Sequence, residues 1–73
     1  MDRSTFILQI GSNLKRLRKK RGFTQQQLAI DCEMKISQIS RIEMGVMNTS
    51  ISVLYTISIA LEVDINEFFD LND

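Results

Sequence analysis

The sequence contains no histidine and no proline, and it has one cysteine among its 73 residues. A single cysteine excludes a disulfide within the chain, and without histidine the Cys/His zinc sites cannot be assembled. We therefore expect no metal and no cofactor. A chain of this length buries only about 60% of the surface that its unfolded form exposes. Association with a second copy is then the remaining way to gain stability.

Long apolar runs are also missing. The apolar cluster at residues 6–10, which Gln9 interrupts, is too short for the core of a signal peptide or for a membrane span. We expect a cytoplasmic protein with no membrane partner. Because no proline-rich, low-complexity or repeated segment marks a linker, residues 1–73 are expected to form one domain.

The charges cancel in number but are segregated along the chain. Residues 1–48 hold all nine basic residues and four of the nine acids, whereas residues 49–73 hold five acids and no base. A basic half can face phosphates while an acidic half points away, because the local field decides such a contact. The alternative is that the basic run at 15–21 is only the solvated end of a helix.

The first predicted helix spans about residues 6–21. Its apolar residues recur three or four positions apart, and the basic run loads the last turns, where the helix dipole favours cations. Gly22 is expected to end the helix. The positions that form its apolar stripe are Phe6, Ile10, Leu14 and Leu17.

Capping signals predict four further short helices. Thr24 followed by Gln27 is a capping-box pattern, so a second helix is expected to begin at 25. A third follows at about 36–44, with Gly45 as its stop. Ser50 is expected to cap a fourth helix that runs to about 61, and Asp64 a fifth that ends near 71. No segment alternates with period two, so the predicted fold is all-α, a compact bundle of about five short helices.

The most informative stretch reads Thr24-Gln25-Gln26-Gln27-Leu28-Ala29, then Met34, then Ile39-Ser40-Arg41-Ile42-Glu43-Met44-Gly45. It resembles the phage repressor/Cro-type (XRE-like) helix-turn-helix family, a lambda repressor-like DNA-binding domain, over about residues 6–69. The short length is similar to that of restriction-modification controller proteins. The resemblance implies a helix-turn-helix core at about 24–45 and a sequence-specific, double-stranded DNA-binding transcription regulator, with helices at about 50–71 for dimerisation.

This resemblance implies a recognition helix at about 36–44 that enters the major groove, which is about 12 Å wide. Ile39 and Ile42 must then point inward. The residues expected to contact bases are Ile36, Ser37, Ser40 and Arg41. The residues expected to contact phosphates are Gln25, Lys35 and Gln38. Alternatives stay open for three of them: Ile36 as a core residue, and Arg41 and Gln25 as ordinary helix-surface residues.

The family also pairs an arginine near the end of the first helix with the glutamate of the recognition helix. Arg18 and Glu43 occupy these positions, so the resemblance implies a structural ion pair with bidentate geometry. The chain departs from the family at Glu33, where a glycine is usual. A left-handed backbone there would cost about 1 kcal/mol relative to glycine, so a differently built turn is also open.

The C-terminal quarter carries more apolar side chains than one helix face can bury. Tyr55, Ile59, Phe69 and Leu71 fall outside the predicted core stripe, and we expect them to form the interface of a homodimer that binds an inverted repeat. The alternative is an antitoxin-like or other protein-interaction module that uses this surface for another protein. We expect no enzyme and no small-molecule ligand, because no catalytic or phosphate-binding motif is present.

Overall fold

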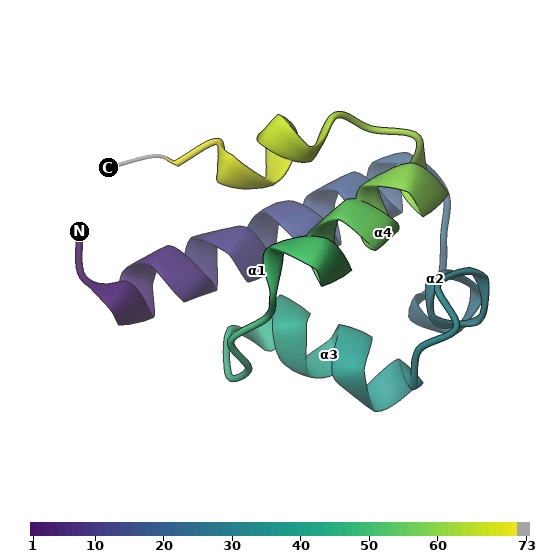
Figure 1. The fold of residues 1–73 in the computed structure, drawn as a ribbon, viewed down its shortest axis with the longest axis horizontal. Coiled ribbons are helices and arrows are strands. Elements are labelled where there is room, and N and C mark those ends of the chain that lie inside the picture. The colour runs from purple at the N-terminus through teal and green to yellow at the C-terminus, as the bar shows by residue number, and fades with distance from the viewer. Residues whose placement is uncertain (72–73) are drawn as a thin grey trace.

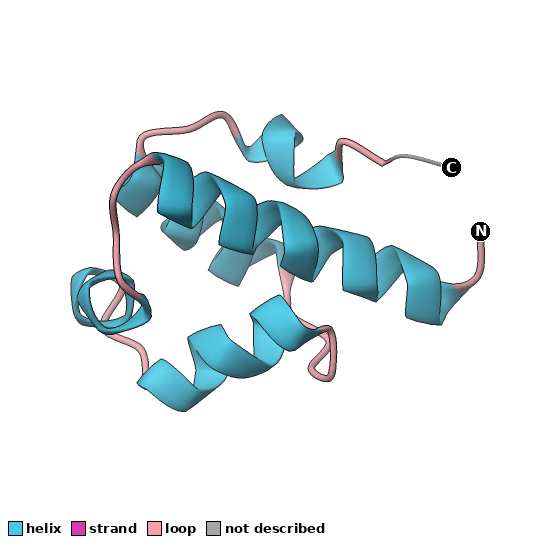
Figure 2. Cartoon of the chain, turned by 180° about the vertical axis from the view of Figure 1, so that it is seen from behind, coloured by secondary structure: helices cyan, strands magenta, loops and turns pink. Residues whose placement is uncertain are grey.

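The computed structural model describes residues 1–71, which form four α-helices and one 3₁₀ turn (Figure 1). The helices are α1 (Arg3–Lys20), α2 (Gln25–Asp31), α3 (Ile36–Met44) and α4 (Ile51–Leu61), and the 3₁₀ turn is η1 (Ile65–Phe69). Figure 2 shows helices and loops only, so no strand occurs among the described residues. The prediction of an all-α bundle is confirmed.

The first two helices begin where side chains accept their free backbone N–H groups. The Asp2 carboxylate accepts a hydrogen bond from the Thr5 N–H at 2.8 Å, so α1 begins three residues before the predicted start. At α2 the predicted capping box forms. The Thr24 hydroxyl accepts from the Gln27 N–H at 3.0 Å, and the Gln27 amide oxygen accepts from the Thr24 N–H at 3.0 Å. The N-termini of α1 and α2 are therefore each determined by residues within one helical turn.

The C-terminal elements start as predicted, but the last one differs in type and length. Ser50 caps α4 by accepting from the Val53 N–H at 3.2 Å, and Asp64 caps η1 by accepting from the Asn66 N–H at 2.9 Å. The predicted fifth helix forms as a 3₁₀ helix, η1, which ends at Phe69 and not near residue 71. A 3₁₀ helix forms i→i+3 hydrogen bonds and has three residues per turn, so it is typical of short segments such as this one.

The core is one apolar cluster to which every element contributes. Its eight most completely buried side chains are Phe68, Leu14, Leu17, Leu28, Ile39, Ile42, Ile57 and Leu61. Phe6 departs from the predicted core stripe because it is 37% exposed. It stacks instead on Phe69 of η1, with ring centroids 6.4 Å apart.

α1 is the central element, and α3 and η1 lie on opposite sides of it in both views (Figures 1 and 2). The contact with α3 is unusually close at Gly11. A Cβ atom placed there would lie 2.1 Å from the Ile42 carbonyl oxygen and 2.9 Å from that of Glu43. A glycine in the middle of α1 therefore lets the backbone of α3 approach, which offsets its low helix propensity.

Side chains of α1 and of Arg21, the residue that follows it, also hold the C-terminal half of the chain. The Asn13 amide donates to the carbonyl oxygens of Phe68 and Asp70, both at 2.9 Å. The Arg21 Nε donates to the Leu61 carbonyl at 3.0 Å and so satisfies one of the free carbonyls at the end of α4. α4 itself ends at Glu62 in a left-handed conformation, with φ of 57°.

Candidate nucleic-acid interface

α2 and α3 form a helix-turn-helix unit joined by a tight turn (Figure 1). Glu33 occupies the turn with φ of 55°, the left-handed conformation that glycine adopts most easily. The Met34 N–H donates to the Ala29 carbonyl at 2.8 Å and closes the end of α2. Glu33 therefore has the left-handed conformation at the position where the family usually has glycine. The turn is not built differently from the family's, so that alternative is wrong.

α3 has a buried side and an open side. Ile39 and Ile42 point into the core and are 0% and 2% exposed. Ile36 is 49% exposed, so it lies outside the core. Ser37 and Arg41 are exposed and Ser40 is half-buried, and the side chain of Arg41 makes no bond with any described residue. The predicted base-contact residues thus share the side of α3 that other elements leave open.

The first turn of α3 carries polar groups beside this open side. The Gln38 amide oxygen accepts from the Lys35 N–H at 3.0 Å, which caps α3 although Lys35 itself offers no accepting side chain. The Gln38 NH₂ group and the Lys35 ammonium have donors left over. Lys35 and Gln38, two of the three residues predicted to contact phosphates, therefore keep donors available at the same end of α3.

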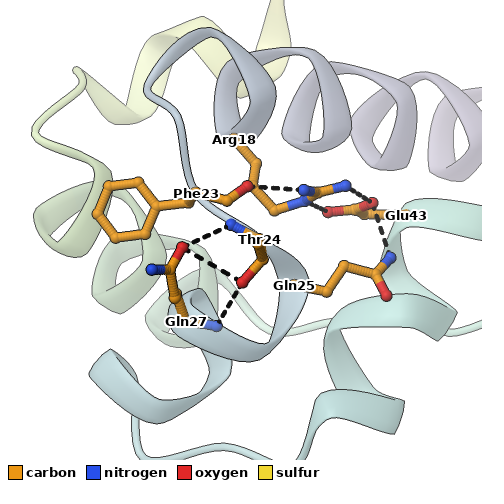
Figure 3. Close-up of polar contacts among 6 residues, drawn as sticks. All are labelled: Arg18, Phe23, Thr24, Gln25, Gln27 and Glu43. Carbon is orange, nitrogen blue, oxygen red and sulfur yellow. Dashed lines mark hydrogen bonds and ion pairs between the residues drawn. The ribbon is translucent and has the colours of Figure 1, made fainter.

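The last turn of α3 is bound to α1 by the ion pair that the resemblance implies (Figure 3). Arg18 Nε donates to Glu43 Oε2 at 2.6 Å, and Arg18 Nη2 donates to Glu43 Oε1 at 3.1 Å. Their side chains are 9% and 3% exposed. A third donor of the guanidinium, Nη1, lies 2.8 Å from the Phe23 carbonyl. The pair is bidentate, buried and hydrogen-bonded on its remaining side, which are the conditions under which a buried ion pair is tolerated.

Gln25 joins the same cluster, a contact that the sequence analysis missed. Its Nε2 donates to Glu43 Oε1 at 3.0 Å, so the Glu43 carboxylate is shared between α1 and α2 (Figure 3). One amide hydrogen is used in this bond and the other remains. No spacing rule connects residues 25 and 43, because their contact depends on the angle between α2 and α3.

The basic run at 15–21 does not form one uniform phosphate-facing surface. Arg18 is buried in the ion pair, and Arg21 contacts the end of α4, where it also lies 3.5 Å from Glu62. The residues of the run that stay exposed without such a contact are Lys15, Arg16, Lys19 and Lys20. Two of the six basic side chains therefore stabilise the fold.

The residues predicted for a dimer interface lie in two places. Tyr55 and Ile59 are 57% and 60% exposed on one stripe of α4, and Ile51, one turn earlier and 64% exposed, extends this stripe. Phe69 is half-buried by its stack on Phe6, and Leu71, which follows η1, is exposed. Ile51 was not among the predicted interface residues, and it is the first residue of α4. We call Ile51, Tyr55 and Ile59 the α4 patch.

Residues 1–71 contain no group of three potential metal ligands and no helix that is both long and apolar enough to span a bilayer. The lone thiol, Cys32, is buried, and burial together with the neighbouring Asp31 charge raises its pKa. A raised pKa leaves less of the reactive thiolate at neutral pH.

The fold and the open side of α3 define a DNA-binding domain of the helix-turn-helix class. Residues 11–73 match the family described as a helix-turn-helix domain. The chain belongs to this family, in the phage repressor/Cro-type group, and the prediction of the family is confirmed. Its family and fold are those of DNA-binding transcription regulators.

Relatives from sequence and structure agree with this assignment. The chain is 39% identical over 62 residues to the HTH-type transcriptional regulator SlrR of Bacillus subtilis, and it spans 41% of that protein's length. It superposes on the restriction-modification controller protein C.AhdI of Aeromonas hydrophila with a TM-score of 0.83 at 27% identity, covering 86% of this chain and 96% of that one. It also superposes on SinR, a master regulator of biofilm formation solved in complex with DNA. The TM-score is 0.78 at 32% identity, covering 84% and 98% of the two chains.

Proposed function

We propose that this protein is a sequence-specific transcription regulator of the cytoplasm that places α3 in the major groove of double-stranded DNA. The observation that carries the proposal is the open side of α3, where Ile36, Ser37, Ser40 and Arg41 have no role in the core. A single α-helix fits the major groove. SinR, with a similar fold, was solved in complex with DNA.

Each of these side chains suits a contact with base edges. The Arg41 guanidinium matches the paired acceptors of guanine, and the exposed aliphatic side chain of Ile36 suits a thymine methyl group. Ser37 and Ser40 carry hydroxyl groups that can donate or accept. Together they provide charged, apolar and hydroxyl contacts, the mixture that distinguishes one base pair from another.

The phosphate contacts are proposed for Gln25, Lys35 and Gln38. Gln25 is held by Glu43 through one amide hydrogen, and its second hydrogen is proposed to bind a phosphate oxygen. Because Glu43 also binds Arg18, the positions of Gln25 and α3 are set by one carboxylate. Such contacts orient the protein on the duplex without selecting a sequence.

We further propose that the protein binds as a homodimer through the α4 patch. Three exposed apolar side chains one turn apart form a continuous stripe, which a second copy can cover by two-fold symmetry. The α4 patch and the open side of α3 lie on different helices, so both recognition helices of the dimer stay free to bind DNA. Two-fold symmetry then predicts an inverted repeat with half-sites about one helical turn, or roughly 34 Å, apart.

Substitutions on the two helices separate base from phosphate contacts. Arg41→Ala is expected to lower affinity for the preferred site by about 1 to 3 kcal/mol and to relax the preference at one base pair. Gln25→Ala is expected to weaken binding to preferred and random duplexes alike. Arg16→Ala removes an exposed arginine of α1 and serves as the matched control, with full sequence preference retained. Equal losses on both duplexes for Arg41→Ala would remove it from the base contacts.

Sedimentation at micromolar concentration tests the dimer. Ile59→Asp is expected to give monomers, whereas Ile30→Asp, which changes an equally exposed isoleucine on α2, is expected to leave the dimer intact. A parent protein that is monomeric with and without DNA would contradict the homodimer. It would favour the antitoxin-like alternative, in which the α4 patch binds a different protein.

A further inference from the structure

A cavity of about 190 Å³ lies where the N-terminal half of α1, the loop after α3, the start of α4 and η1 meet. Its floor is made by the buried side chains of Ile10, Ile42 and Leu54, and its mouth by exposed Asn48 and by Ile51, which also belongs to the α4 patch. The backbone of α4 lies closest to α2 and η1, and its buried side chains meet those of α1 and α3 in the shared core. The cavity occupies the space between these helices, behind the side of α3 that we propose faces DNA.

The lining determines what kind of molecule fits. Apolar side chains from four elements form most of the wall, and Asn48 and Thr49 add an amide and a hydroxyl at one edge. No charged side chain of the described residues lines the cavity. An ion would lose its hydration there without a compensating partner. An enclosed apolar cavity of about 150 Å³ takes up benzene. The present cavity is open on one side, and its volume of about 190 Å³ has room for one aromatic ring with a small substituent.

We propose that this cavity binds an uncharged small molecule of about the size of one aromatic ring, carrying a single hydrogen-bonding group that reaches Asn48 or Thr49. A ring in the cavity contacts the floor residues on three helices and gains the dispersion contacts that an unfilled space lacks. The proposal does not depend on DNA binding. The sequence predicts no ligand, because the lining residues come from four separate segments that only the fold brings together.

Three probes that share one ring test the proposed chemistry. Benzene, phenol and benzoate are titrated separately into the protein while the methyl resonances of Ile10, Ile42 and Leu54 are followed by NMR. Phenol and benzene are expected to give saturable shifts at these methyls, with phenol binding more tightly, and benzoate is expected to give none. Shifts with benzoate equal to those with phenol would overturn the proposed selectivity for an uncharged molecule.

Filling the cavity provides the matched variants. Ile7→Phe places a ring into the space from α1 and is expected to weaken phenol binding at least tenfold, whereas Ile30→Phe, on exposed α2 surface, is expected to leave it unchanged. If circular dichroism shows that Ile7→Phe does not fold, Asn48→Trp obstructs the mouth from an exposed loop and is expected to give the same loss. Absence of saturable shifts in the parent, or equal phenol binding by the filled variant, would overturn the proposal. Shifts of the Ile10, Ile42 and Leu54 methyls that depend on protein concentration and not on phenol would overturn the proposal and assign the cavity to a second copy of the chain.

Discussion

The close approach of α1 and α3 at Gly11 makes a strong prediction, because the substitution that raises helix propensity should lower stability. Gly11→Ala gains at most about 1 kcal/mol from propensity. The new Cβ would lie 2.1 Å from the Ile42 oxygen, so the helices must separate by about 0.9 Å to reach even a tight contact of 3.0 Å. The obstacle is backbone, so no side chain can rotate away. Overpacking of this kind costs about 1 to 3 kcal/mol, and we expect the upper end.

The expected net loss for Gly11→Ala is therefore about 2 kcal/mol, which corresponds to a fall in Tm of roughly 8 to 16 °C for a domain of this size. Thermal and urea unfolding followed by circular dichroism measure it. Ser12→Ala is the control, since Ser12 is the next residue of α1 and is exposed, and it should be neutral or slightly stabilising. A Gly11→Ala protein as stable as the parent would refute the close packing of α3 on α1.

Three further predictions concern charge and backbone conformation. Removing one partner of the buried ion pair, by Arg18→Met or Glu43→Gln, is expected to lower the free energy of unfolding by about 3 kcal/mol. The double change should lower it by less than the sum of the two single changes. A double-mutant cycle without coupling energy would show that the two groups do not interact. The hydrogen bond from Thr5 holds the pKa of Asp2 below its ordinary value of 3.8, so its contribution is present above that pH and is lost as the pH falls through the lowered pKa. The stability difference between the parent and Asp2→Asn, measured from pH 5 to pH 2, should therefore shrink on acidification, and a constant difference would contradict this. Glu33→Gly should stabilise the fold by up to about 1 kcal/mol in urea unfolding, because Glu33 has a left-handed backbone, and a loss of stability would show that its side chain compensates.

Features that depend on neighbouring residues could be predicted from the sequence. The capping box of Thr24 and Gln27 determines the start of α2 within one turn, and the apolar spacing of Ile39 and Ile42 determines which side of α3 is buried. The pairing of Arg18 with Glu43 spans 25 residues and followed only from the family resemblance. Local rules and that resemblance together accounted for the helix-turn-helix unit.

Features that depend on how helices cross could not be predicted. Gly11 looks like an unfavourable helix residue until the α3 backbone is placed beside it, and Gln25 looks like a surface residue until Glu43 is brought to it. Phe6 fits the apolar spacing of α1, yet it lies near the start of that helix, where it stacks on Phe69 and borders the cavity, so it stays partly exposed. The cavity beside Ile42 and Leu54 is likewise lined by residues from four separate segments of the chain, which only the fold brings together.

Selection of bound sequences from a random pool of DNA duplexes, using the purified protein alone, tests the central claim most directly. The account predicts enrichment of one inverted repeat with half-sites about one helical turn apart, and loss of preference at a single base pair in each half-site for Arg41→Ala. The affinity for the enriched duplex should fall steeply as the salt concentration rises, because each subunit binds several phosphates and releases their counterions. A pool that shows no enrichment, or enrichment that Arg41→Ala leaves unchanged at every position, would contradict the placement of α3 in the major groove.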